Sequence, residues 1–162
     1  MRKCVIAAFL IAAYLLTASS FAQDSGGART VDAAWMNAMK ANDLDGIVRC
    51  YAPDAVAWLP GLPMAKGEKA IRAAYEGLLS ANTIKDVLIS EAQYKTTDNL
   101  SVGWGGFTLT LVPKATGQPI AMTGRFTEVA EVRNNQWVYI VDHASADPAP
   151  GDTGKKQGEI LE

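Results

Sequence analysis

Residues 120–145 read IAMTGRFTEVAEVR, then NN, then QWVYIVDHAS, and this stretch decides the fold. Both arms alternate apolar and polar residues with a period of two, which is the side-chain period of a β-strand. The pair Asn134-Asn135 between them can adopt the positive φ angles that a two-residue turn requires. The sequence therefore predicts a long β-hairpin whose strands cover residues 120–133 and 136–145.

A turn at Asn134-Asn135 also predicts the register, because Arg133 then lies opposite Gln136 and every later pair follows from it. One face of the hairpin would carry the pairs Val132–Trp137, Ala130–Tyr139, Glu128–Val141 and Phe126–His143. The opposite face would carry Glu131–Val138, Val129–Ile140, Thr127–Asp142 and Arg125–Ala144. The first face is aromatic and apolar apart from one glutamate and one histidine, a composition that indicates a pocket floor.

The two ends of the chain differ from the rest in composition. Arg2 and Lys3 precede an apolar run over residues 4–16, and small residues stand at positions 20 and 22. This pattern predicts a signal peptide over residues 1–22, cleaved after Ala22, and hence an exported protein that is periplasmic or secreted. An uncleaved N-terminal anchor is the alternative. We expect residues 23–27 to be a linker, 28–146 to be one domain, and 147–162 to be a disordered tail.

Charge and cysteine content exclude several classes of partner. Without its first 22 residues the chain keeps 13 Lys and Arg and 17 Asp and Glu, a net charge of −4, and it has no basic run. Nucleic acid and, after signal cleavage, membranes are therefore not expected partners. Cys50 would be the only remaining cysteine, so no intrachain disulfide can form, and it reads as a small buried hydrophobic residue.

Apolar residues with helical spacing predict three helices before the sheet, over residues 28–40, 44–51 and 66–80. Asp43 stands directly before the second of them, where its carboxylate can accept backbone amides as an N-cap; a catalytic acid is the alternative reading. Strands are predicted over residues 55–59, 83–96 and 99–112. The last contains Gly103, Gly105 and Gly106, which indicate a bend, a bulge or a close approach of backbone.

Helices followed by strands predict an α+β domain with a mostly antiparallel sheet. The helices must bury their apolar stripes, and the aromatic face of the hairpin and its neighbours is the surface large enough to receive them. A curved sheet closed on its concave side by three N-terminal helices would form a cone with a pocket at its open end.

An ordered set of short motifs resembles a known family. The motifs are Trp35-Met36-Asn37, Asn42-Asp43-Leu44-Asp45, Tyr51 to Val56, Pro60-Gly61, Gly67 to Arg72 and the closing segment 137–145. In this order they resemble the SnoaL-like, ketosteroid-isomerase-like branch of the nuclear transport factor 2 superfamily. The resemblance implies a cystatin-like, cone-shaped α+β fold, a hydrophobic pocket, and a homodimer formed through the outer sheet face.

The closing segment also resembles the association domain of calcium/calmodulin-dependent kinase II, in which the positions matching Glu128 and His143 line the pocket. The resemblance does not carry over steroid isomerisation. Leu59 stands where the general base is expected, Trp35 where the enolate-stabilising tyrosine is expected, and no acid stands near Gly124. Arg125 and Asp142 could imitate half of the epoxide-hydrolase set, but the predicted register puts both on the outer face as a surface ion pair.

His143 is the only histidine, so any imidazole chemistry would use it as a general base, with Glu128 to orient it. Aromatic residues would form the walls of the ligand site: Trp35, Trp58, Trp104, Phe126, Trp137 and Tyr139. We expect neither a metal nor a cofactor.

These residues are compatible with three functions. The first is a pocket that binds a small, largely apolar molecule without turnover. The second is an isomerase, lyase or hydrolase that uses His143 as its base. The third is a structural association module.

Overall fold

The computed structural model describes residues 26–148. The predicted signal peptide (residues 1–22), residues 23–25 of the predicted linker and residues 149–162 of the predicted tail lie outside the described residues, and they remain predictions.

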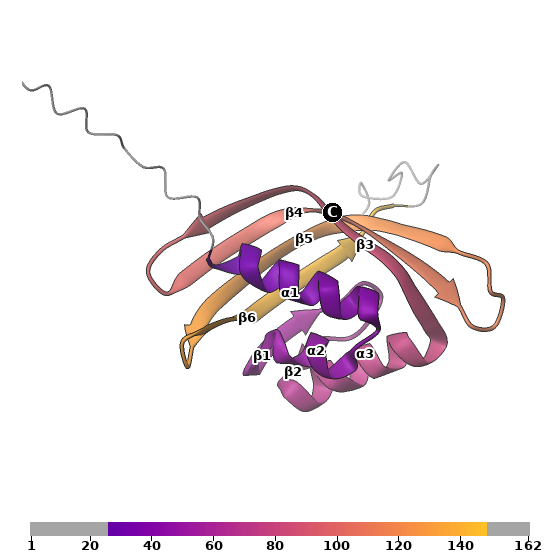
Figure 1. The fold of residues 1–162 in the computed structure, drawn as a ribbon, viewed down its shortest axis with the longest axis horizontal. Helices are drawn as coiled ribbons and strands as arrows, with labels where there is room; N and C mark the ends of the chain where they lie inside the picture. Colours follow the sequence, from indigo (N-terminus) through magenta and orange to yellow (C-terminus); the bar gives the residue numbers. More distant parts are fainter. Residues whose placement is uncertain (1–25, 149–162) are drawn as a thin grey trace, which may run out of the picture.

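Three helices and six strands make up the described chain. Their order is α1 (Ala28–Ala41), α2 (Leu44–Arg49), β1 (Tyr51–Trp58), β2 (Ala65–Lys66), α3 (Glu68–Ala81), β3 (Asn82–Thr96), β4 (Leu100–Pro113), β5 (Ile120–Arg133) and β6 (Gln136–Ala146). Figure 1 shows the helices gathered on one face of a curved sheet. No helix of the described region is long and apolar enough to cross a membrane.

The six strands form one sheet in the order β2-β1-β6-β5-β4-β3. β1 and β6 run parallel, and every other neighbouring pair is antiparallel. The sheet is curved but does not close, so β2 and β3 are its edges. The predicted α+β fold class, with three N-terminal helices on a mostly antiparallel curved sheet, is confirmed.

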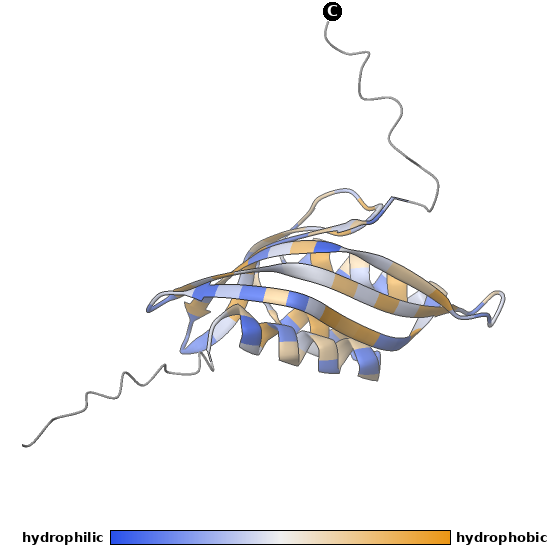
Figure 2. Ribbon diagram, turned by 90° about the horizontal axis from the view of Figure 1, so that it is seen from above, coloured by the Kyte–Doolittle hydropathy of each residue, from blue (hydrophilic) through white to orange (hydrophobic). Residues whose placement is uncertain are grey.

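The core lies between the helices and the concave face of the sheet. Val31 and Met39 of α1 and Ile71 and Tyr75 of α3 are buried there against alternate residues of the strands. Figure 2 shows that hydrophilic and hydrophobic residues alternate along the long strands, as expected for a sheet with one covered face.

The structure confirms the predicted cap of α2. The carboxylate of Asp43 accepts a hydrogen bond from the backbone N–H of Gly46 at 2.9 Å. This contact satisfies one of the free amides at the start of the helix. The capping interpretation therefore accounts for Asp43 without a catalytic role.

The predicted boundary between α2 and the first strand was wrong. The helix ends at Arg49 rather than at residue 51, and β1 already begins at Tyr51. Cys50 explains the difference, because its carbonyl oxygen accepts a hydrogen bond from the backbone N–H of Tyr139 at 2.8 Å. Because this carbonyl is bonded to β6, it is not available for the hydrogen bond that would continue the helix.

The turn of the final hairpin is confirmed. Asn134 and Asn135 both have positive φ, 52° and 62°, and Arg133 lies opposite Gln136. The predicted pairs hold as far as Ala130 with Tyr139.

Beyond that point the predicted register was wrong, because β6 contains a bulge. Val129 pairs with Val141, so Ile140 has no partner of its own in β5. One extra residue in one strand shifts every later pair and changes which side chains share a face. Glu128 therefore lies opposite Asp142, and Thr127 lies opposite His143.

Candidate functional site

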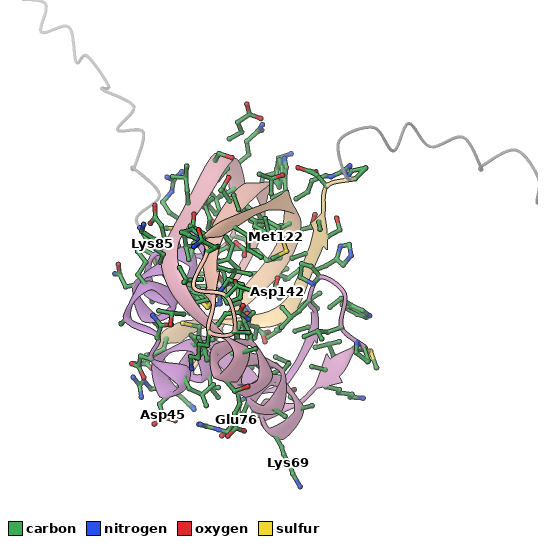
Figure 3. The ribbon with its side chains drawn as sticks, turned by 90° about the vertical axis from the view of Figure 1, so that its right-hand side faces the viewer. Asp45, Lys69, Glu76, Lys85, Met122 and Asp142 are labelled. Atoms are coloured by element: carbon green, nitrogen blue, oxygen red, sulfur yellow. The ribbon has the colours of Figure 1, made fainter. Side chains whose placement is uncertain are left out.

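Three carboxyl groups meet in the interior of the domain: Asp32 of α1, Glu128 of β5 and Asp142 of β6. They are only 1%, 4% and 8% exposed. Figure 3 places Asp142 at the centre of the molecule, whereas Lys69 points away from it into the surroundings. We call these three residues the acidic cluster, because charged side chains are rarely this buried without a specific role.

Asp32 is held by two tyrosines from different strands. Its two carboxylate oxygens accept one hydrogen bond each, from Tyr139 of β6 and from Tyr94 of β3, both at 2.5 Å. Because Asp32 lies on the helix and both donors lie on the sheet, these bonds tie α1 to the concave face.

A directed chain of hydrogen bonds ends on Asp142. The hydroxyl of Tyr51 donates to the Asp142 carboxylate at 2.7 Å, so its oxygen is free to accept from Tyr75, also at 2.7 Å. The Tyr75 oxygen in turn accepts from the indole N–H of Trp35 at 3.1 Å. All of these donors point toward Asp142, which stabilises its ionised form.

Glu128 lies in an environment that favours its neutral form. Burial raises the pKa of Glu128 well above its usual range, and its hydrogen bond with Asp32 and the negative charges of Asp32 and Asp142 raise it further. Its Oε1 atom is buried without a hydrogen-bond partner among the described residues. Gly103 lies opposite, and a Cβ there would lie 2.4 Å from this oxygen, so a larger residue at position 103 would displace the end of the Glu128 side chain.

Asp142 is perturbed less strongly. Burial raises its pKa to about 6, while the hydrogen bond from Tyr51 opposes the shift and the charge of Asp32 adds to it. The cluster thus combines a carboxyl group that changes charge near neutral pH with one that stays protonated there.

We expect the contribution of Asp142 to the free energy of unfolding to fall as pH rises through the mildly acidic range. A carboxyl whose pKa is higher in the folded protein binds more protons there than in the unfolded chain, so deprotonation destabilises the fold. For Asp142 this loss starts near pH 3.8 and is complete above about pH 6. It amounts to roughly 3 kcal/mol of unfolding free energy. The test is urea unfolding of wild type and Asp142→Asn at pH 3.5 and pH 7. The unfolding free energy of the wild type relative to that of Asp142→Asn should be lower at pH 7 than at pH 3.5.

Asp98→Asn serves as the control, because residue 98 is exposed. This variant should follow the wild type at both pH values. A difference between wild type and Asp142→Asn that stays constant over this range would contradict the raised pKa.

Two adjoining cavities lie beside the acidic cluster. The acidic cavity, about 40 Å³, is lined by Asp32, Trp35, Ile89, Phe107, Phe126, Glu128, Tyr139 and Asp142. The apolar cavity, about 90 Å³, is lined by Trp35, Met39, Leu59, Pro60, Leu62, Ala74, Tyr75, Leu78, Phe107, Leu109 and Met122. Trp35 and Phe107 line both cavities, so these two side chains lie where the cavities adjoin, and the carboxyl groups line only the acidic one.

His143 does not lie in this space. It is exposed on the outer face of the sheet, opposite Thr127 and beside Trp58, whose ring centroid is 6.4 Å from that of the imidazole. The predicted geometry, in which His143 faces inward next to Glu128, was wrong. The bulge at Ile140 brings Asp142 to the inner face instead, although Asp142 was predicted to be on the outer one.

The six predicted wall residues divide into two groups. Trp35, Phe126 and Tyr139 line the acidic cavity as expected. The other three lie elsewhere. Trp58 is 40% exposed and pairs with His143 on the outer face, and Trp104 pairs with Thr127 on that same face. Trp137 lines a separate surface groove of about 710 Å³ between α1, α2 and the hairpin turn.

Several features of the site were not predicted from the sequence: Asp32, Tyr51, Tyr75, Tyr94, Phe107 and the inward position of Asp142. Asp32 could have been found, because it falls on the apolar stripe of α1 together with Ala28, Trp35 and Met39. Asp142 had a weaker signal in the apolar run of residues 138–141, which breaks the strict alternation of β6.

Within residues 26–148, no group of three or more His, Cys, Asp or Glu side chains is arranged to hold a metal ion. The free thiol of Cys50 is buried, and burial raises its pKa to about 11, so it is a poor nucleophile.

Comparison with known proteins shows which family and which solved structures this chain is similar to. Residues 33–140 match the family model of the SnoaL-like domain. No curated protein matches the sequence.

Solved structures with the same fold include three bacterial proteins. A protein from Xanthomonas campestris named as a calcium/calmodulin-dependent protein kinase II association domain is 27% identical, with a TM-score of 0.68 over 76% of this chain and 89% of that one. A ketosteroid isomerase-like protein from Erwinia carotovora is 18% identical, with a TM-score of 0.69 over 80% and 100%. A nuclear transport factor 2-like protein from Salmonella enterica is 15% identical, with a TM-score of 0.66 over 76% and 91%.

Proposed function

Because the chain belongs to the SnoaL-like domain family, we propose that it is an exported pocket protein that binds a small, largely apolar molecule. The binding site in this proposal is the space formed by the acidic and apolar cavities. The observation that carries it is the distribution of polar groups: aromatic and aliphatic side chains line most of the space, and the acidic cluster stands at one end. Such a combination is typical of small-molecule sites.

A variant that fills the apolar cavity tests this proposal. Ala74 of α3 lines the cavity, so Ala74→Leu should occupy much of its volume and abolish the thermal stabilisation produced by a bound ligand. Ligands are first sought by thermal shift with a library of small apolar compounds, where saturation at 100 times Kd stabilises by about 2.7 kcal/mol.

Ala73→Leu is the matched control, because residue 73 lies on the same helix and is exposed. It should bind like the wild type. Equal binding by both variants would place the ligand outside the apolar cavity and contradict the proposal.

A second candidate function, an isomerase, lyase or hydrolase, is favoured by the separation of two pKa values in one cavity. Asp142, with a pKa raised by burial to about 6, can accept a proton near neutral pH, while Glu128 stays protonated beside it. Here Asp142 takes the role that the sequence pattern had suggested for His143. For any substrate that the protein turns over, Asp142→Asn should lower kcat about 100-fold or more; unchanged kcat would exclude this role.

Self-association through the outer sheet face is the remaining part of the proposal. This face carries Trp58 and Trp104 together with Thr127 and His143, and one similar structure is named as an association domain. Sedimentation velocity should show a homodimer, and a single monomeric species at micromolar concentration would contradict it. Export is tested separately by N-terminal sequencing of the protein from its own host, which should begin at Gln23 and not at Met1.

A further inference from the structure

The acidic cluster forms no ion pair within the described residues, although the exposed imidazole of His143 lowers the pKa of Asp142. The ion pairs of this part of the chain lie at the surface, and none includes Asp32, Glu128 or Asp142. Arg29 stacks on the ring of Tyr94 with its guanidinium carbon 4.5 Å from the ring centroid, but it forms no ion pair with Asp32. Buried carboxylates are normally paired with a cation, because removing an unpaired charge from water is costly.

The hydrogen-bond donors around the cluster are already used, and the proton of the neutral Glu128 is engaged in its hydrogen bond with Asp32. Tyr94 and Tyr139 donate to Asp32, and Tyr51 donates to Asp142. What is left at the cluster is acceptor capacity: Glu128 lines the acidic cavity, and its Oε1 atom, which lies beside Gly103, is buried without a partner among residues 26–148. A molecule that satisfies this site must therefore bring hydrogen-bond donors of its own.

The walls of the acidic cavity suit a positive charge as well. Trp35, Phe107, Phe126 and Tyr139 surround the cavity, and the faces of aromatic rings attract organic cations. The cavity volume of about 40 Å³ is only a few times the roughly 10 to 15 Å³ that a cavity needs to hold one water molecule, so only a compact polar group fits beside the carboxyls.

We propose that the acidic cavity binds the ammonium group of a small primary amine, whose hydrocarbon part lies in the apolar cavity. This proposal rests on the proposed function, since it names the chemical class of the ligand for the same site. An ammonium group supplies both missing elements, a positive charge and up to three donors. A neutral alcohol would supply one donor and no charge, and a carboxylate would add negative charge to an acidic site.

A matched series of ligands tests the class. The probes are n-pentylamine, 1-pentanol and pentanoate, which share one hydrocarbon chain, titrated calorimetrically into the purified full-length protein at pH 7.5. We expect the amine to bind at least tenfold more tightly than the alcohol, and pentanoate not to bind. Because a cation favours the ionised form of neighbouring carboxyls, amine binding should release protons, which is measured by repeating the titration in buffers of different ionisation enthalpy.

Variants of the cluster provide the second arm of the test. Glu128→Gln and Asp142→Asn keep the shape of the side chains, and each should weaken amine binding at least tenfold while changing alcohol binding less than twofold. Glu131→Gln is the matched control, because Glu131 lies on the same strand and bonds to Arg133 on the outside. Circular dichroism and melting curves show that each variant is folded before it is titrated.

Two results would overturn the inference. The first is equal affinity for the amine and the alcohol, which leaves the pocket function intact but removes the ammonium class. The second is amine binding that neither Glu128→Gln nor Asp142→Asn weakens. Absence of binding by all three probes, together with no ligand found in the thermal-shift screen, would remove the proposed function as well.

Discussion

Alanine at position 124 is expected to cost about 3 kcal/mol of unfolding free energy, at the upper end of the effect of overpacking a core. Gly124 lies in β5 between Phe107 of β4 and Ala146 of β6. A Cβ atom there would lie 2.2 Å from the backbone oxygen of Ser145 and 2.6 Å from two ring atoms of Phe107. The Ser145 oxygen belongs to the backbone of β6, so relief requires a shift of that strand or of the ring that lines both cavities.

Urea unfolding of Gly124→Ala measures this cost. Gly77→Ala is the control, because Gly77 lies in α3 with nothing within 4 Å of an added Cβ, and it should gain up to about 1 kcal/mol from the better helix propensity of alanine. A loss smaller than about 1 kcal/mol at position 124 would show that the sheet yields there far more easily than its packing suggests.

Removal of the Asp32 carboxylate is expected to have a similarly large effect, roughly 3 kcal/mol in Asp32→Ala. Both oxygens of Asp32 accept from tyrosine hydroxyls, and each buried hydroxyl that loses its acceptor costs about 1 to 3 kcal/mol. Relief of the repulsion with the ionised Asp142 offsets part of this cost, since the charge of Asp32 contributes to the raised pKa of Asp142.

A double-mutant cycle with Tyr94→Phe separates the cost of the lost hydrogen bond from the gain by relief of charge repulsion. If the lost hydrogen bond dominates, the double variant should be more stable than the sum of the two single changes predicts, because the hydroxyl that would have been left without an acceptor is gone. Asp45→Ala is the control, since Asp45 forms an exposed ion pair with Arg72, and such pairs contribute less than about 1 kcal/mol. An effect of Asp32→Ala no larger than that of the control would contradict the anchoring role of Asp32.

Local patterns in the sequence were sufficient to predict most helices and strands of this fold. Helical spacing predicted three helices, the pair Asn134-Asn135 predicted the final turn, and Asp43 was recognised as a cap. The glycines of β4 were predicted to indicate a bend, a bulge or a close approach of backbone. They do accommodate a bulge, but that bulge lies in the neighbouring strand β3. Glu91 has a φ of 53° there, and Gly105 leaves room for the carbonyl of Ser90.

The site was harder to predict, because it depends on contacts between distant segments. The side of the sheet that Asp142 and His143 face is set by one unpaired residue in β6, and the period of two in the sequence cannot show it. Asp32 was overlooked because an acidic residue on an apolar stripe acquires meaning only when its two tyrosine donors are known. The inward position of Glu128 was predicted correctly, because the extra residue lies in β6 and leaves the alternation of β5 intact.

The unpaired residue Ile140 makes the hairpin respond differently to insertions and deletions of equal size. A chain without Ile140 would still pair Tyr139 with Ala130 and Val141 with Val129, so the acidic interior would survive. A residue added to β5 between positions 129 and 130 would instead complete regular pairing and turn the strand over beyond it. Such an insertion would turn His143 to the inner face and Glu128 and Asp142 to the outer face. A single added residue would therefore replace the acidic interior by one that contains the imidazole.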